Sequence, residues 1–416
     1  MNLFLIIIVA LIGVKLLVEL ALDLLNRRRV QQESGSVPEA YRDFIDAATY
    51  DKSVAYTLAK NALSMAEATY GVAILLVALF SGVLPWLWEA ILGWTGPTVW
   101  GQAVSLFSIM WLLGLAALPI DWYAQFRLEE RFGFNKGTLS LWLADKVKGG
   151  AIGAVIGIPV LAFLLWLVGT TPWWWLIGFV AMLLFQLVMM VLYPMFILPL
   201  FNKFEPLPDG ELRDRLMALG TRTGFHARSI LVMDGSRRSA HSNAYFTGFG
   251  RFRRIVLFDT LVDQLEPSEL EAVLAHEIGH YKLGHIPKIL VLSGFTLFLS
   301  FVVLGWLDRQ AWFVESFGFA ADGSVGPVFL LFGLLAGLFT FWTAPVFNLM
   351  SRKHEYEADA YARETLSGDP APLIRALRGL SEKNLSNLTP HPLFSAFHYS
   401  HPTLLERERS LRDRGQ

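Results

Sequence analysis

Runs of about 20 apolar residues, separated by short polar segments, recur along most of the chain. An α-helix rises about 1.5 Å per residue, so roughly 20 residues cross the hydrocarbon layer of a bilayer. The pattern therefore predicts a predominantly α-helical membrane protein with seven transmembrane helices. Their expected bounds are about 3–25, 70–92, 99–122, 149–168, 174–200, 286–307 and 328–350.

The first apolar run has to be distinguished from a cleaved signal peptide. It is long, Arg27–Arg29 follow it rather than precede it, and no small-residue cleavage site comes after it. These features indicate a retained anchor. Residues 31–65 are polar and mixed in charge, which predicts an amphipathic helix on the membrane surface.

The polar segment 201–285 is the larger of two soluble pieces. A short helix is expected at Gly210–Gly220, and β-branched and aromatic residues predict three strands at 229–234, 243–248 and 254–258. Ser268 and Glu271 fit an S-x-x-E capping box, so a further helix is expected to begin there. The sequence thus predicts a small α+β unit in which a sheet lies beside this helix.

Two domains are expected. The first, 1–200, is a membrane domain with five spans; the second, 201–416, holds the α+β unit and the last two spans. Lys and Arg residues occur in the loops after spans one, three and seven, but not after spans two and four. By the positive-inside rule the N-terminus is outside, and the α+β unit and C-terminus face the cytoplasm. The C-terminal residues match no eukaryotic retention signal, which favours a bacterial inner membrane.

Composition narrows the chemistry. The chain of 416 residues is 54% hydrophobic and only 17% charged, as expected of a protein that contacts a lipid bilayer. The formal net charge of −1, with no basic domain, argues against nucleic-acid binding. There is no cysteine, so a metal ion can be bound only by histidine and carboxylate ligands. All nine histidines lie at or after His226, so a metal site is expected in the second half of the chain.

The strongest chemical signal is the H-E-x-x-H pattern formed by His276, Glu277 and His280. Histidines four residues apart on a helix are separated by about 40° around its axis, so both imidazoles can bind one metal ion. Glu277 can then reach a water molecule at that ion, as in zinc peptidases. The alternative is a solvated helix face that carries histidine and glutamate by chance.

A catalytic zinc ion needs a third protein ligand. His285 projects about 140° from His280 on a continuous helix and misses the metzincin spacing. Glu355 is the better candidate, because it follows the seventh span on the same side of the membrane. Asp359, four residues later, could accept a hydrogen bond from a ligand histidine. His354 is another candidate for the third ligand. A different interpretation of the acidic residues Glu355, Glu357 and Asp359 is that they form a solvent-exposed helix face without a metal ion.

Taken together, these and other motifs resemble those of the type I CAAX prenyl proteases, a family of integral-membrane zinc endopeptidases. The matching stretches cover about residues 120–410: Glu129–Lys136, Leu198–Lys203, Asp234–Phe246, Val256–Thr260, His276–His280, Ser351–Asp359 and His401–Pro402. Thr403 stands where a second proline is common, a departure that affects no expected catalytic residue.

The resemblance implies a fold and a site. The expected fold is a ring of seven helices around an intramembrane chamber, with one zinc ion bound by His276, His280 and Glu355. Glu277 is the expected general base and Asn243 is expected to bind the substrate backbone. His401 would stabilise the oxyanion, and Asp359 and Arg407 would support the ligands. Considered without the resemblance, Asn243 is an ordinary turn residue and His401 a helix cap before Pro402.

The expected function is zinc-dependent endopeptidase activity on a peptide or protein substrate, either prenylated or membrane-embedded, by a chain that acts as a monomer. One alternative is a quality-control protease that cleaves damaged membrane proteins without prenyl specificity. The other is a seven-helix transporter or receptor with a structural metal ion. Glu277 discriminates between enzyme and structural site, because a purely structural site does not need a general base.

Overall fold

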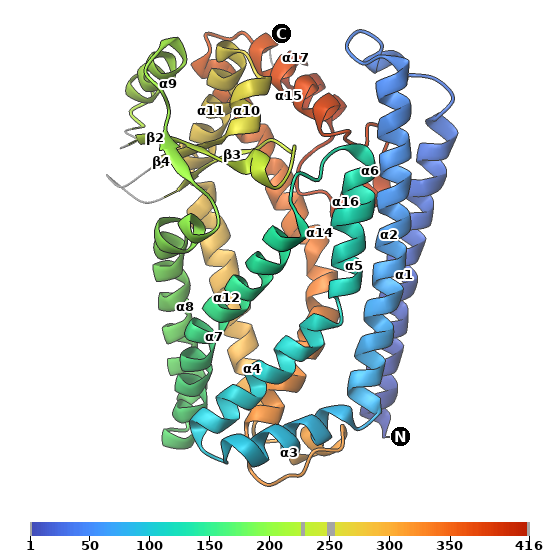
Figure 1. The fold of residues 1–416 in the computed structure, drawn as a ribbon, viewed down its shortest axis with the longest axis vertical. Coiled ribbons are helices and arrows are strands. Elements are labelled where there is room, and N and C mark those ends of the chain that lie inside the picture. Colours follow the sequence, from blue (N-terminus) through green and yellow to red (C-terminus); the bar gives the residue numbers. More distant parts are fainter. Residues whose placement is uncertain (1, 226–228, 248–253, 414–416) are drawn as a thin grey trace.

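The computed structural model describes residues 2–225, 229–247 and 254–413, and long helices dominate it (Figure 1). The helices are α1 Leu3–Glu33, α2 Ala47–Phe80, α3 Val83–Thr95, α4 Val99–Leu115, α5 Leu118–Tyr123, α6 Glu130–Phe132, α7 Leu139–Thr170, α8 Trp174–Leu192, α9 Glu211–Arg222, α10 Asp259–Gln264, α11 Pro267–Lys282, α12 His285–Leu307, α13 Ala311–Glu315, α14 Gly326–Thr365, α15 Ala371–Lys383, α16 Pro392–His398 and α17 Leu404–Asp413. The N-terminus and α3 lie at one end of the molecule, and the β-sheet, α11 and α17 lie at the other (Figure 1). We call these the α3 end and the sheet end.

Within the described residues, six helices are long and apolar enough to cross a membrane, or seven if the bent pair of α4 with 118–132 is one span. This pair bends by 42°, so the expected third span is not straight. Pro119 at the start of α5 lacks an N–H donor, which suits a helix start and interrupts the hydrogen bonding of α4.

The second expected span is wrong in its bounds. It was expected at about 70–92, after a separate surface helix within 31–65. Instead α2 runs without a break from Ala47 to Phe80, and α3 begins after Gly82. Gly82 has φ 80°, a left-handed conformation that ends a helix and favours glycine. The polar and apolar stretches are thus parts of one helix, and the apolar run continues past its end.

The long helices pack together at the α3 end. Buried side chains from α1, α2, α3, α4, α7, α8, α12 and α14 form one apolar cluster there. Gly326 at the start of α14 lies against the ring of Trp88 on α3, so an added Cβ would collide with Trp88 Cη2. Close packing at this end joins the helices, while the sheet end carries the polar residues of the candidate site.

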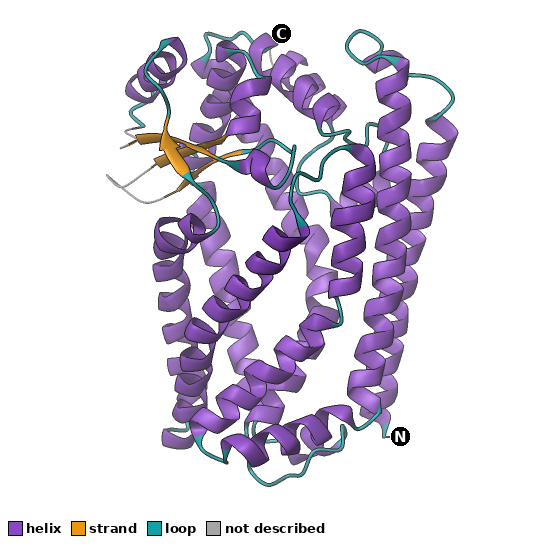
Figure 2. Cartoon of the chain, viewed as in Figure 1, coloured by secondary structure: helices purple, strands orange, loops and turns teal. Residues whose placement is uncertain are grey.

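A mixed four-stranded sheet stands at the sheet end (Figure 2). Its strands are β1 Phe204–Pro206, β2 Ser229–Met233, β3 Ala244–Thr247 and β4 Arg254–Phe258, in the order β1-β2-β4-β3. β2 and β4 are parallel, with Leu231 opposite Val256, whereas β1 and β3 are antiparallel to their neighbours. The strand β1 was not expected from the sequence. A second apolar core joins this sheet to α9, α11, α15 and the end of α14.

The helix that carries H-E-x-x-H begins earlier than expected. Its N-cap is Glu266, whose side chain and that of Glu269 form the capping box, so the predicted pair Ser268 and Glu271 is wrong. Pro267 explains the shift, because proline is favoured at the first helical position and requires no hydrogen bond for its missing N–H.

Candidate metal centre

Two imidazoles face each other on α11. His276 and His280 are one helical turn apart, and their Nε2 atoms lie 3.1 Å from each other. Their rings are inclined by 83°, and His276 is buried. Spacing on one helix therefore brings two nitrogen donors to a single point.

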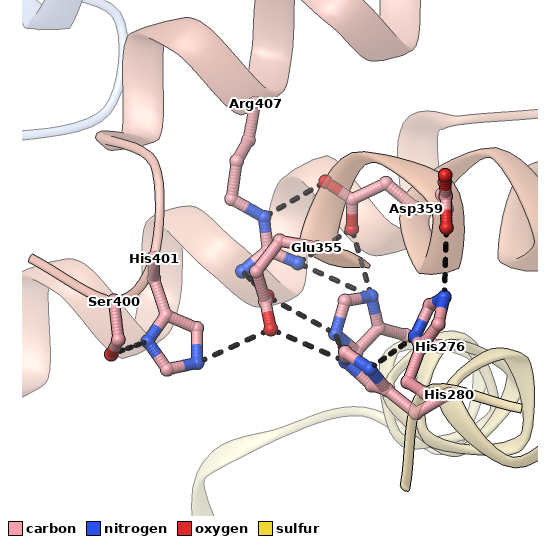
Figure 3. Close-up of polar contacts among 9 residues, drawn as sticks. His276, His280, Glu355, Asp359, Ser400, His401 and Arg407 are labelled. Carbon is pink, nitrogen blue, oxygen red and sulfur yellow. Dashed lines mark hydrogen bonds and ion pairs between the residues drawn. The ribbon is translucent and has the colours of Figure 1, made fainter. Parts of the chain in front are cut away.

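Glu355 of α14 completes this group of donors (Figure 3). Its Oε1 atom lies 3.2 Å from His280 Nε2, and its Oε2 atom lies 3.4 Å from His276 Nε2. Glu355 is only 4% exposed, so the alternative interpretation that it belongs to a solvated acidic face is wrong. The three residues contribute one donor atom each, all within 4.8 Å of one another.

The donor set fits a divalent metal ion. Glu355 Oε2 is buried and makes no hydrogen bond with any residue that the structure describes. A buried carboxylate oxygen that accepts no hydrogen bond is costly, and a cation between it and the two imidazoles would remove that cost. Two nitrogens and one carboxylate, without thiolates, also match the ligand types of catalytic zinc.

Asp359 and Arg407 contact the outer side of this group. Asp359 Oδ1 lies 2.9 Å from His276 Nδ1, and the Arg407 guanidinium donates to both carboxylate oxygens of Asp359. Burial by itself lowers the pKa of His276, but hydrogen bonds to Asp359 and Glu355 outweigh it and raise this pKa to about 9. Burial lowers the pKa of Arg407 as well, yet Asp359 raises it overall, so the guanidinium stays charged.

A cavity of about 190 Å³ opens beside the donor group. Glu277, His276 and Glu355 line it together with Arg407, and burial raises the pKa of the Glu277 carboxyl. The cavity therefore brings a carboxylate that is not in the donor set to the same space as the three-donor group.

Two residues from distant segments line the same cavity. Asn243 lies directly before β3, the strand at the end of the sheet order. His401 precedes α17, with its Nε2 atom 3.4 Å from Glu355 Oε1 and its Nδ1 atom 2.9 Å from Ser400 Oγ (Figure 3). Ser400 was not among the residues expected from the sequence, although its position next to His401 is a signal that points to it. A larger cavity of about 600 Å³ also reaches His401.

His285 and His354 are not in the three-donor group. They lie with Glu357 in a neighbouring cluster, in which the ring of His285 stacks on that of His354. His285 would lie on another face than His280 only if one continuous helix carried both residues. The chain instead turns at Gly284, with φ 67°, and His285 begins α12. His285 therefore comes back towards His280, a contact that the sequence analysis did not foresee.

Comparisons with known proteins agree with this architecture. Residues 26–203 match the family described as "CAAX prenyl protease N-terminal, five membrane helices", and residues 206–415 match "Peptidase family M48". CAAX prenyl protease 1 of Saccharomyces cerevisiae is 38% identical over 416 aligned positions, which cover 93% of this chain and 91% of the relative. A homologue from Arabidopsis thaliana is 36% identical, with 90% of each chain covered, and one from Homo sapiens is 31% identical, with 93% and 91% covered.

A solved structure is similar along the whole length. The crystal structure of S. mikatae Ste24p has a TM-score of 0.90 and 37% sequence identity, and 99% of each chain is covered. The three relatives named above are eukaryotic, so they give no support to the expected bacterial inner membrane. The apolar helices and the family of five membrane helices make this an integral multi-pass membrane protein. The chain belongs to the CAAX prenyl protease family of M48 membrane metallopeptidases.

Proposed function

We propose that this chain is a zinc-dependent endopeptidase in which His276, His280 and Glu355 bind one zinc ion. The observation that carries the proposal is the convergence of two imidazole Nε2 atoms on the buried carboxylate of Glu355, whose Oε2 atom accepts no hydrogen bond from the described residues. A structural metal site in a transporter or receptor would not need the additional carboxylate of Glu277, which lines the cavity beside it.

Bound zinc supplies Lewis acidity, which lowers the pKa of a water molecule to about 7 and polarises the scissile carbonyl group. Glu277 accepts a proton from the attacking water and delivers it to the leaving amine, because its side chain lines the cavity next to the ligands. His401, which also lines this cavity, donates a hydrogen bond to the developing oxyanion.

Further residues hold the substrate and the ligands. Asn243 lies directly before β3, which is at the end of the sheet order, where a peptide can be held in an extended conformation by backbone-like hydrogen bonds. Asp359 accepts a hydrogen bond from His276 Nδ1, which leaves the Nε2 lone pair for the metal ion. Arg407 neutralises Asp359, so that carboxylate can be buried.

The proposed substrates are peptides or proteins with a prenylated C-terminus. The support is the name of the relatives, CAAX prenyl protease 1, together with coverage of nine-tenths or more of both chains. One chain supplies all the proposed site residues, so we propose that a monomer is active. The proposed site faces the cytoplasm, because the basic segments Arg27–Arg29 and Arg352–Lys353 lie on α1 and α14 near the sheet end.

The deciding experiment separates zinc binding from catalysis. Glu277→Gln should retain one zinc ion per chain by elemental analysis but fail to cleave a farnesylated peptide, whereas Glu355→Ala should lose the ion. Glu364→Gln is the matched control, since Glu364 is exposed further along α14. Cleavage by Glu277→Gln would refute the proposed base, and full zinc content in Glu355→Ala would refute the third ligand.

Two further comparisons address substrate and orientation. Equal rates on farnesylated and unmodified forms of the same peptide would favour a quality-control protease over prenyl processing. A C-terminal tag that is accessible from outside the membrane would overturn the proposed orientation.

A further inference from the structure

The turn between α11 and α12 brings a third histidine behind the proposed ligands. α11 ends at Lys282, Gly284 takes the left-handed conformation, and α12 begins at His285. The Nδ1 atom of His285 lies 2.9 Å from the Nδ1 atom of His280. The side chain of His285 is only 1% exposed, so this contact is shielded from water.

The hydrogen positions follow from ligation of His280, and this step rests on the proposed function. A neutral imidazole that binds a metal ion through Nε2 carries its hydrogen on Nδ1. His280 Nδ1 therefore donates, and His285 Nδ1 accepts. His285 must then carry its own hydrogen on Nε2, which lies 2.9 Å from Glu357 Oε2, an acceptor. In this relay, which runs from His280 through His285 to Glu357, each N–H donor has an acceptor. The positions of the hydrogens are therefore fixed.

We propose that His285 and Glu357 are positioning residues that hold His280 in the tautomer and orientation required for zinc binding. His276 is held in the same way by Asp359, which contacts its Nδ1 directly. Residues two apart on a helix point about 200° from each other, so Glu357 faces away from Glu355 and Asp359. His285 bridges the resulting gap between Glu357 and His280.

A second metal ion in the cluster of His285, His354 and Glu357 is the competing interpretation, because their donor atoms lie within 4.8 Å of one another. The ring geometry argues against it. The two imidazole rings are stacked, with centroids 4.0 Å apart and an interplanar angle of 8°. An imidazole nitrogen directs its lone pair within the ring plane, and one ion cannot lie in two parallel planes.

The test measures zinc affinity of the full-length protein in detergent by competition with a chelator. His285→Phe retains a ring against His354 but removes the acceptor, so zinc should bind about 10- to 100-fold more weakly, the usual effect of losing such a contact. His285→Asn places an amide oxygen near the position of Nδ1 and should recover part of this loss. Glu357→Leu should also weaken binding, whereas His354→Phe should not.

The outcomes separate this inference from the proposed function. If the wild-type protein binds no zinc, the proposed metal centre is wrong. If it binds one ion and His285→Phe binds it equally well, the positioning role is wrong. Two ions per chain, one of them lost in His354→Phe, would establish the second metal site instead. If His285→Phe does not fold, the affinities of His285→Asn and Glu357→Leu decide: wild-type affinity in Glu357→Leu would reject the relay.

Discussion

Gly279, next to the ligand candidate His280, is a point of close approach between α11 and α14 beside the candidate metal centre. A Cβ atom at this position would lie 3.1 Å from the Cα of Ala358, 3.2 Å from its carbonyl oxygen and 3.2 Å from Tyr361 Cβ. Ordinary carbon contacts begin at about 3.4 Å, so Gly279→Ala requires the two helices to separate by roughly 3.4 − 3.1 = 0.3 Å. Two of the three close atoms are backbone, which cannot rotate away.

The separation acts directly on the proposed ligands. His276 and His280 are on α11 and Glu355 is on α14, so a shift of about 0.3 Å exceeds the tolerance of about 0.2 Å in metal–ligand distances. Overpacking of this kind costs about 1–3 kcal/mol. If α11 and α14 separate in the metal-free protein, zinc binding must bring them together again. The overpacking energy then weakens zinc binding by about 5- to 150-fold. If they do not separate, the overpacking energy appears as lower stability of the metal-free protein.

Both quantities can be measured on one preparation. Chelator competition gives the zinc affinity, and thermal unfolding in detergent after metal removal gives the stability. Gly337→Ala is the matched control, because Gly337 lies on α14 with nothing within 4 Å of an added Cβ, and alanine is the better helix former. If Gly279→Ala matches the wild type in both measurements, the close approach of the helices does not govern the metal centre.

Three other changes have defined outcomes. Arg407→Leu leaves the buried carboxylate of Asp359 without its ion pair and should reduce the free energy of unfolding by about 3–5 kcal/mol, with part of the loss recovered in a double variant that also carries Asp359→Asn. Gly326→Ala places a Cβ against the Trp88 ring and should cost about 1–3 kcal/mol by thermal unfolding, and a smaller side chain at Trp88 should offset it. His401→Ala should lower kcat by about 100- to 1,000-fold at unchanged zinc content, and an unchanged kcat would remove His401 from the proposed mechanism.

Local sequence patterns were sufficient to predict a structural feature when that feature lies within a single helix or strand. The spacing of His276 and His280 predicts a shared helix face, and their Nε2 atoms lie 3.1 Å apart. The composition around Leu231 and around Val256 predicts the strands β2 and β4, whereas their parallel pairing is seen only in the structure. Element ends were harder to predict, because the apolar run that crosses Gly82 does not reveal that α2 stops there.

The longest-range features could not be read from spacing. His285 lies on a remote face of an ideal helix, but the left-handed turn at Gly284 returns it to His280. Glu357 reaches the same relay from α14, 72 positions along the chain from His285. Neither contact has a signature in the local sequence.

The sequence by itself determined the membrane-spanning character, the exclusion of thiolate metal sites and the pair of donors on α11. These properties follow from the composition of the chain and from helical periodicity, and neither requires contacts between distant segments. Only the tertiary structure decided that Glu355 is buried beside that pair, that Arg407 neutralises Asp359 and that His285 stands behind His280. Such contacts join segments up to 131 positions apart, as between His276 and Arg407, so they exist only once α11, α14 and α17 have packed together.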